Sequence, residues 1–336
     1  MTGLRIRFVD RRVELEALAA WASRQRELPL YLYGPEGCGK TRLVKEFVAR
    51  VEELVGGDTL AVYIDALEES SLRSAIAVSA GLSPALDALE DLVAGLGEGV
   101  GRVLAKQLTR LLGRILSRTA MSGKKLVVVV DDVVGALGLE RVEWYIKWVY
   151  EASWRLLEEY GLEAATFIVL TSEGRSLEKV WSHSHAATFM VWNLGRQAFE
   201  ELVEQLSVPE GLDREAVWRL LGGNPRRLLE LVTVYDWSLE AMLDAYTERL
   251  RGVVEYAAQE GLTGALARIV EDPDAAAEAY RAKRLLLEHN LLLPVSTMLG
   301  FHRLEPSRSL GVGRHYAWQT PLLREAVAKL LGEPPG

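Results

Sequence analysis

The sequence predicts an α/β fold in which a doubly wound parallel sheet is followed by helices and then by a small module of helices and short strands. Over the first 195 residues, short apolar runs alternate with amphipathic helical patterns, as in parallel sheets covered on both faces. A glycine-rich turn joins the first of these runs to a helix. The alternation then stops, and only helical patterns follow as far as residue 250.

Composition bounds the kind of protein. The chain has 336 residues, enough for two or three domains, and its net charge of −8 argues against nucleic-acid binding over the whole surface but not against a local basic patch. A single cysteine excludes an internal disulfide framework. No apolar run reaches the roughly 20 residues of a membrane span, and the N-terminus lacks the apolar core of a signal peptide. We therefore expect a cytoplasmic protein without membrane contact.

Residues 8–20 predict an amphipathic helix that Asp10 caps, with Val13, Leu15 and Leu18 on its apolar face. A buried strand at residues 30–33 follows, and it leads directly into the motif G-x-x-x-x-G-K-T at residues 34–41.

This strand–turn–helix motif predicts a phosphate-binding loop (P-loop). Its glycines permit positive φ and let backbone N–H groups approach phosphates, and the following helix N-terminus adds partial positive charge. Lys40 would bridge the β- and γ-phosphates of ATP, and the Thr41 hydroxyl would ligate Mg²⁺. The other residues of the predicted cofactor-binding loop are Gly34, Pro35, Glu36, Gly37, Cys38 and Gly39.

Residues 60–65 predict a second strand, and residues 68–121 are helical in pattern. Within them, basic residues recur every four positions with aliphatic residues between: Arg102, Lys106, Arg110, Arg114 and Arg118. Two interpretations stay open for this basic helix. It packs on the sheet with a solvated arginine face, or it is a docking surface for nucleic acid or an acidic partner.

The run of aliphatic residues at 126–130 predicts a central strand buried on both faces, and it ends in two aspartates. Ligands of open α/β sheets bind at the carboxyl ends of the strands. Asp131 is therefore predicted to hold Mg²⁺, as a Walker B aspartate does, and Asp132 to orient or deprotonate an attacking water.

Residues 139–160 predict a long helix whose tryptophans, among them Trp144, we expect in the core. The strand at 166–170 ends in Thr171 and Ser172, either of which would fill the role of γ-phosphate sensor, with Ser172 as the chosen candidate. Plain turn capping is the alternative for this pair. Arg175 lies just beyond, in a position open to an arginine finger on a neighbouring subunit.

Residues 196–250 predict a helical lid that contains Gly-Gly-Asn-Pro at 222–225. Its glycines end one helix and Pro225 starts the next, which places Arg226 near a helix N-terminus. The helix dipole disfavours a cation there, and a nearby phosphate would remove the conflict. An ordinary helical corner is the alternative interpretation.

Residues 251–336 predict two helices, a glycine-rich hairpin and a final helix, similar to a winged helix. The hairpin region carries an excess of basic side chains, and Arg303, Arg308 and Arg314 are the candidates for contacting double-stranded DNA. The same surface would equally suit a wing that faces solvent or packs on the remainder of the chain.

These parts together resemble the archaeal ATPase family, in the STAND branch of AAA+-like P-loop ATPases. The resemblance rests on residues 8–15, the P-loop, the aspartate pair, Thr171-Ser172 and Gly-Gly-Asn-Pro. It implies domains at 1–195 (ATPase core), 196–250 (lid) and 251–336 (winged helix). It also implies that Asp10 and Arg11 border the adenine, that Pro225 faces the nucleotide, and that Arg226 acts as a second phosphate sensor.

The sequence departs from vigorous ATPases of this kind, which usually carry glutamate where this chain has Asp132, and it shows no convincing arginine finger. We therefore expect an ATP–Mg²⁺ switch that hydrolyses slowly and couples its nucleotide state to DNA. The alternative is a signalling or chaperone-like scaffold whose winged helix docks a protein or a second copy of the chain. A motor would need a turnover of at least about 1 s⁻¹.

Overall fold

The computed structural model describes residues 6–68, 75–80, 122–171, 177, 180 and 183–332. The chain divides into two compact units. The first contains Met1–Asp10, Gly34–Gly39 and Met190–Gly336, and the second contains Arg11–Tyr33 and Lys40–Phe189. Among the described residues, no helix is long and apolar enough to cross a membrane.

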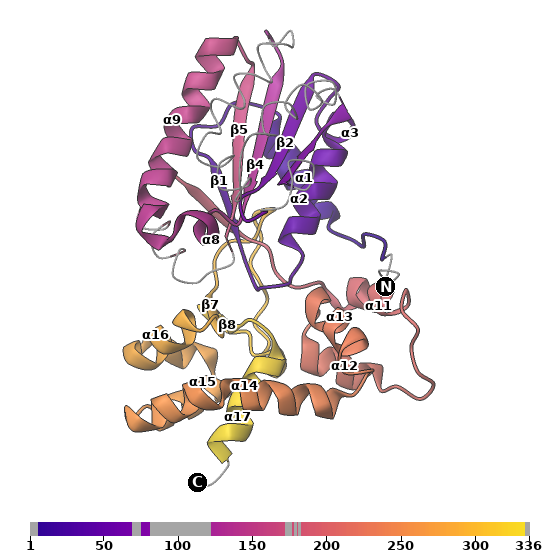
Figure 1. The fold of residues 1–336 in the computed structure, drawn as a ribbon, viewed down its shortest axis with the longest axis vertical. Helices are drawn as coiled ribbons and strands as arrows, with labels where there is room; N and C mark the ends of the chain where they lie inside the picture. The colour runs from indigo at the N-terminus through magenta and orange to yellow at the C-terminus, as the bar shows by residue number, and fades with distance from the viewer. Residues whose placement is uncertain are drawn as a thin grey trace. The chain divides into compact units, whose positions relative to one another are not determined.

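The second unit is built on a six-stranded sheet in the order β3-β2-β4-β5-β1-β6. The strands are β1 (Leu30–Tyr33), β2 (Thr59–Asp65), β3 (Ile76–Val78), β4 (Lys125–Asp131), β5 (Ala164–Leu170) and β6 (Ala187–Met190). β2, β4, β5 and β1 are parallel neighbours, which confirms the predicted α/β class. Because β1, β4 and β5 are parallel, their carboxyl ends lie along one edge of the sheet, with β5 between β1 and β4 (Figure 1).

The edge strand β3 corrects the helical prediction for residues 76–78. Val78 pairs with Val62 of β2 in an antiparallel ladder. Ile76 and Val78 are β-branched, and such residues favour a strand over a helix. The predicted basic helix at 102–118 lies outside the described residues.

Helices cover both faces of this sheet. Figure 1 shows α9 (Val142–Tyr160) on one side, and α1 (Arg12–Ala22), α2 (Lys40–Ala49) and α3 (Val51–Leu54) on the other. The short elements α8 (Val133–Leu137) and η2 (Leu139–Arg141) connect β4 to α9. The core expectation is wrong for Trp144, which is 56% exposed and stacks on Trp148 at the outer surface of α9.

The predicted Asp10 cap is also wrong. α1 begins at Arg12, its N-cap is Arg11, and no side chain accepts a hydrogen bond from the first turn. Asp10 and Arg11 both adopt left-handed backbone conformations, with φ of 52° and 68°. This geometry turns the chain before the helix in place of a side-chain cap.

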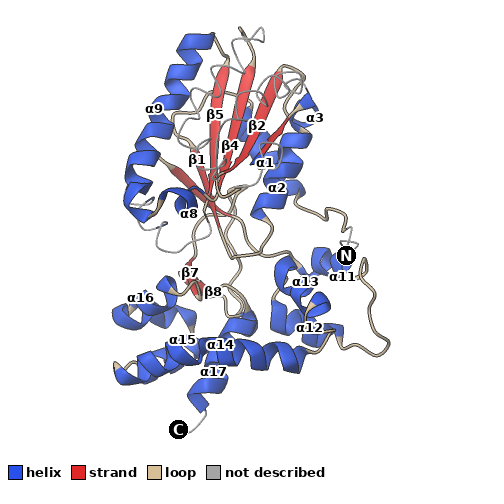
Figure 2. Cartoon of the chain, in the orientation of Figure 1, coloured by secondary structure: helices blue, strands red, loops and turns tan. Residues whose placement is uncertain are grey.

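The first unit is mostly helical (Figure 2). Its elements are α11 (Arg196–Val203), α12 (Arg214–Leu221), α13 (Pro225–Thr233), α14 (Leu239–Gln259), α15 (Thr263–Glu271), η3 (Pro273–Ala277), α16 (Tyr280–Glu288), β7 (Leu292–Pro294), η4 (Arg308–Leu310), β8 (Tyr316–Trp318) and α17 (Pro321–Gly332). β7 and β8 form a two-stranded antiparallel sheet.

One hydrophobic cluster holds these elements together, from Leu194 before α11 to Leu330 in α17. α14 runs without a break across residue 250, where the lid was predicted to end. The helices around Gly222 and the C-terminal elements therefore share a core, because α14 and α17 pack against each other within it.

Candidate nucleotide-binding site

The glycines of the P-loop permit backbone conformations and close approaches that other residues would not. Gly37 and Gly39 have φ of 79° and 100°, backbone conformations that residues with a Cβ rarely adopt. A Cβ placed on Gly39 would meet no atom of the described residues within 4 Å, whereas one placed on Gly34 would lie 1.8 Å from the Val191 carbonyl oxygen. Cys38 is fully buried and its Sγ donates to the Val191 carbonyl at 3.4 Å, which gives this residue a packing role.

Thr41 and Asp131 meet in the second unit. Thr41 lies in the first turn of α2, and its Oγ1 donates to Oδ2 of Asp131 at the end of β4, at 2.7 Å. Asp131 is 4% exposed. Burial raises the pKa of the Asp131 carboxyl, and hydrogen bonds from Thr41 and Tyr63 offset part of that rise.

Tyr63 is a member of this cluster that sequence reasoning missed. Its hydroxyl donates to Asp131 Oδ2 at 2.9 Å from the neighbouring strand β2, at a buried position. In the sequence, Tyr63 is one of several large residues in a buried strand. Only its position two residues before Asp65, the polar end of β2, signals a place near the site.

The Thr41–Asp131 pair fits a hard divalent cation. Mg²⁺ takes carboxylate and hydroxyl oxygens and keeps several waters, so one or two protein ligands suffice. A cation would also offset the desolvation of the Asp131 carboxylate. No cluster of three or more histidine, cysteine or acidic side chains suited to a metal occurs in the described part of the chain.

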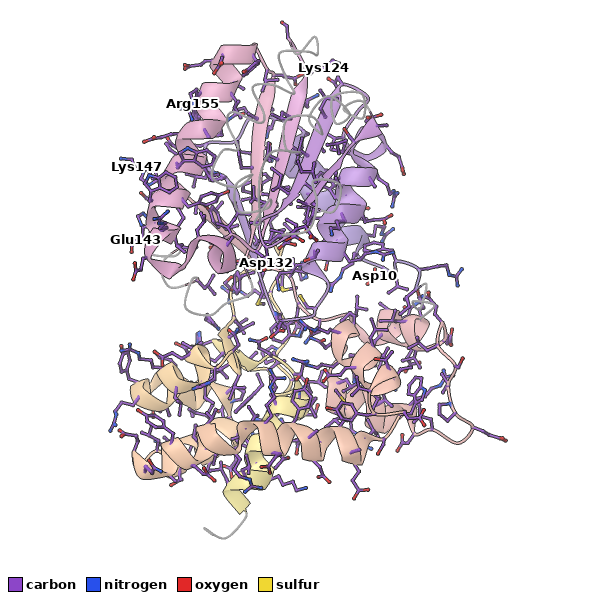
Figure 3. The ribbon with its side chains drawn as sticks, viewed as in Figure 1. Asp10, Lys124, Asp132, Glu143, Lys147 and Arg155 are labelled. Atoms are coloured by element: carbon purple, nitrogen blue, oxygen red, sulfur yellow. The ribbon has the colours of Figure 1, made fainter. Side chains whose placement is uncertain are left out.

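Asp132 lies at the carboxyl end of β4, and Lys124 precedes the opposite end of that strand (Figure 3). The φ of Asp132 is 53°, and its N–H donates to Asp131 Oδ1 at 3.0 Å. The Asp131 carboxylate thus holds the backbone of Asp132 in an uncommon conformation at the edge where the candidate cation site lies.

Thr171 directly follows β5, the strand that lies between β1 and β4 in the sheet. It is 5% exposed, and its N–H donates to the Leu32 carbonyl of β1 at 3.0 Å. The sheet order thus carries Thr171 to the same edge as Asp131. Ser172 and Arg175 lie outside the described residues.

In the first unit, the P-loop contacts the start of α13. Arg226 Nη1 and Glu36 Oε1 form an ion pair at 2.7 Å, with side chains 61% and 40% exposed. The Arg226 N–H donates to the Gly37 carbonyl at 3.3 Å. A Cβ on Gly37 would lie 2.4 Å from Arg226 Cβ, so the glycine is required for this close approach.

The sequence places two cations, Arg226 and Arg227, in the first turn of α13, and each has a carboxylate partner in the structure. Arg226 pairs with Glu36, and Arg227 pairs with Glu230 at 2.8 Å while its guanidinium lies 5.0 Å from the Tyr246 ring centre. Pro225 occupies the first turn of α13 as predicted, and Asn224 caps that helix by accepting the Arg227 N–H.

Arg11 is a buried ion-pair residue. It is 4% exposed, and its guanidinium lies 2.6 Å from a Glu14 carboxylate oxygen within the second unit. Asp10 belongs to the first unit. Sequence reasoning assigned both residues to the adenine, and the Glu14 partner of Arg11 was missed.

Arg303, Arg308 and Arg314 are all exposed on the segment between β7 and β8. The segment is held by two anchors. Arg324 of α17 donates to the carbonyls of Arg308 and Ser309, and Asp274 accepts the backbone N–H groups of residues 314, 315 and 316 at 2.7–3.0 Å.

A glycine-rich loop between a buried strand and a helix, with a buried aspartate contacting its threonine, defines a nucleotide-binding ATPase of the P-loop class. The chain belongs to the family of ATPase domains found predominantly in Archaea, whose model matches residues 8–231. No curated protein sequence matches it. Among solved structures, it is similar to a replication initiator DnaA bound to AMPPCP and single-stranded DNA, at 12% identity and a TM-score of 0.40, over 76% of this chain and 72% of that chain.

Proposed function

We propose that this ATPase binds ATP with Mg²⁺ at its P-loop and hydrolyses it slowly, as a switch. The observation that carries the proposal is the 2.7 Å contact between Thr41 Oγ1 and the buried Asp131 carboxylate, beside Lys40 at the start of α2. Two hard oxygen ligands next to a phosphate-binding lysine are what an ATP–Mg²⁺ site requires.

Each residue of the proposed ATP site then has a specific role. Backbone N–H groups of the loop Gly34–Gly39 and the Lys40 ammonium bind phosphate oxygens, while Thr41 and Asp131 hold the cation, which when bound neutralises charge on the phosphates. Asp132 orients the attacking water. Further tasks follow from the family resemblance: Ser172 and Arg226 sense the γ-phosphate, Pro225 faces the nucleotide, and Asp10 and Arg11 border the adenine.

Two features favour slow hydrolysis. Asp132 has a shorter side chain than glutamate, so its carboxylate reaches a water less well. Arg226 is engaged by Glu36 at 2.7 Å and must leave that carboxylate before it can stabilise a developing phosphate charge. The ion pair is exposed and worth about 0–1 kcal/mol, so exchanging it for a phosphate is energetically accessible.

Calorimetric titration with ATP–Mg²⁺ and with ADP, with turnover measured on the same samples, tests the proposal. We expect wild type to bind both nucleotides and to turn over ATP at less than about 1 s⁻¹. Lys40→Ala should abolish binding. Lys147→Ala is the matched control, since Lys147 lies on the outer side of α9 in an exposed pair with Glu151 (Figure 3). Wild-type protein that binds neither nucleotide would contradict the proposal.

We further propose that the output of the switch is DNA binding through a winged helix formed by the C-terminal elements. Helices α15 and α16, the β7–β8 sheet and α17 occur in an order that suits this module. The loop between the strands presents three exposed arginines, Arg303, Arg308 and Arg314, and Arg324 and Asp274 anchor its backbone at residues 308–309 and 314–316. Exposed cations on a structured loop suit backbone phosphates.

Fluorescence anisotropy with a labelled duplex at several salt concentrations tests this output. Removing one cation that binds a DNA phosphate should lower the slope of log affinity against log salt by about 0.9. We expect Arg303→Ala, Arg308→Ala and Arg314→Ala to weaken binding, and Arg155→Ala on the outer side of α9 to leave it unchanged (Figure 3). If light scattering instead shows ATP-dependent self-association without DNA retention, the protein-docking alternative holds.

A further inference from the structure

Three residues with buried carboxamide side chains, Asn193, Asn224 and Gln319, are joined by hydrogen bonds in the first unit and are here called the carboxamide triad. They are 6%, 0% and 2% exposed. Asn224 Nδ2 donates to Asn193 Oδ1 at 2.8 Å, and Asn193 Nδ2 donates to the backbone carbonyl of Gln319 at 2.9 Å. The triad therefore links the chain before α11, the start of α13 and the junction between β8 and α17.

The triad holds the P-loop by both backbone polar groups of Glu36. Gln319 Oε1 accepts the Glu36 N–H at 2.7 Å, and Asn224 Nδ2 donates to the Glu36 carbonyl at 2.9 Å. Glu36 and Gln319 are 283 residues apart in the sequence. One residue of the phosphate-binding loop is thus held by two side chains from distant parts of the chain.

Gln319 is itself anchored to the C-terminal elements. Its N–H donates to the Leu291 carbonyl at 3.0 Å, next to β7. The preceding Trp318 is fully buried and donates from Nε1 to the Ile269 carbonyl of α15 at 3.1 Å. A displacement of α15 or β7 that preserves these hydrogen bonds would therefore move Gln319, whose side chain accepts the Glu36 N–H.

We propose that Gln319 is a positioning residue for the P-loop, and that the carboxamide triad couples nucleotide binding to the C-terminal elements. The inference rests on the proposed function, since it assigns a regulatory connection to the same ATP site. A buried polar group without its partner is costly, so the position of Gln319 and the conformation at Glu36 favour each other.

The coupling works in both directions by thermodynamic necessity. A ligand on the C-terminal elements that shifts Gln319 changes nucleotide affinity, and a nucleotide that shifts Glu36 changes the affinity for that ligand by the same factor. Couplings between sites are typically about 5–150-fold. This gives the chain a route from the phosphate-binding loop to the candidate DNA-binding elements.

Two measurements on the full chain test the inference. Calorimetry gives the ATP–Mg²⁺ affinity, and hydrogen exchange at the Glu36 amide, measured without nucleotide, reports the Gln319 contact directly. Gln319→Met keeps the side-chain length and removes the acceptor, and Gln319→Glu keeps an acceptor oxygen at the same reach. The control, Asp244→Asn, breaks an exposed ion pair between α14 and Lys329 of α17.

We expect Gln319→Met to weaken ATP affinity about 10-fold, within the usual range for couplings, and to speed Glu36 exchange. Gln319→Glu should retain wild-type exchange; it is scored by exchange alone, because an added charge near phosphates would itself weaken binding. Asp244→Asn should change neither readout. If Gln319→Met fails to fold, Gln319→Asn replaces it, since that side chain stays polar but is one methylene shorter.

Wild-type values of either readout in folded Gln319→Met would overturn the inference. Exchange in Gln319→Glu as fast as in Gln319→Met would also overturn it, because the acceptor would then not be the cause. A wild-type chain that binds no nucleotide contradicts the proposed function instead, and the exchange measurement then decides by itself whether Gln319 holds the P-loop.

Discussion

Asp131 is the residue on which the candidate cation site depends most. It is buried at the end of β4, and its carboxylate oxygens are engaged by Thr41, Tyr63 and the Asp132 N–H. Burial disfavours the charged carboxylate, and the hydrogen bonds from Thr41 and Tyr63 together with the positive charge of Lys40 oppose that effect on its pKa. In the proposed cation site, the Tyr63 hydroxyl would position the Asp131 carboxylate through their 2.9 Å hydrogen bond.

Tyr63→Phe tests this role at the scale of one hydroxyl. Partners of metal ligands typically contribute about 10–100-fold to metal affinity. We therefore expect the Mg²⁺ concentration for half-maximal ATP turnover to rise about 10-fold, with nucleotide binding retained.

Tyr145→Phe is the matched control for that variant. Tyr145 is also a buried tyrosine of the second unit, and its hydroxyl has no hydrogen-bond partner among the described residues. It should show wild-type Mg²⁺ dependence. Equal Mg²⁺ dependence in both variants would remove Tyr63 from the site.

The Gly222-Gly223 turn, which connects α12 to α13, is closely packed within the first unit. The Leu194 N–H donates to the Gly223 carbonyl at 2.9 Å, and Gly222 packs against Pro321 at the start of α17. Both glycines have positive φ. The turn thus packs against segments from before α11 and from the start of α17, which explains two consecutive glycines without invoking a ligand.

Gly223→Ala should destabilise the first unit by about 2–4 kcal/mol, because its Cβ would lie 2.0 Å from the Leu194 carbonyl oxygen at a φ of 79°. Gly252→Ala in α14 is the control: its Cβ would meet no atom of the described residues within 4 Å, so it should stabilise by about 0.5–1 kcal/mol. Urea unfolding measures both, and equal midpoints would refute the packing account.

Asp274 predicts a pH dependence for the segment between β7 and β8. Burial alone would raise the pKa of this carboxyl, but three backbone N–H groups lower it below its ordinary value. A lowered folded-state pKa means that the contribution to stability is present above about pH 3.9, the pKa of an unfolded aspartate, and is lost as pH falls through the lower folded value.

Asp274→Asn should therefore reduce stability at pH 7 by about 1–3 kcal/mol, because the three donors no longer have a charged acceptor. The difference from wild type should shrink as the pH falls below about 3.9. Urea midpoints at pH 7 and pH 3 measure this, and a difference independent of pH would show that the charge is not responsible.

At the scale of the whole molecule, the two units have separate hydrophobic cores, one around the sheet and one among the helices. Residues of the P-loop motif are shared between them: Gly34–Gly39 count with the first unit, and Lys40 and Thr41 with the second. Two cores predict two unfolding transitions in calorimetry.

ATP–Mg²⁺ should raise the unfolding temperature of the unit that holds it. A ligand at 100 times its dissociation constant stabilises the state that binds it by about 2.7 kcal/mol. Lys40→Ala should abolish the shift, and Lys147→Ala should retain it. A shift in one transition alone would show that residues of only one unit hold the nucleotide.

The sequence by itself determined the features that are written in neighbouring residues. The apolar runs predicted β1, β2, β4 and β5, the glycine spacing predicted the loop before α2, and the paired acidic residues predicted the polar end of β4. These succeed because strand burial and loop geometry depend on consecutive side chains. Local patterns failed at Ile76–Val78, where pairing with β2 overrode a helical period, and at Asp10, where backbone conformation replaced a cap.

The tertiary structure alone decided which distant residues meet. Tyr63 on Asp131, Glu36 on Arg226 and Gln319 on the Glu36 N–H join segments separated by 68, 190 and 283 residues. It also carried α14 across the predicted boundary at residue 250, since the shared core with α17 extends past that point. Such contacts depend on how elements pack, and a side chain's eventual partner leaves no mark on the spacing of its neighbours in sequence.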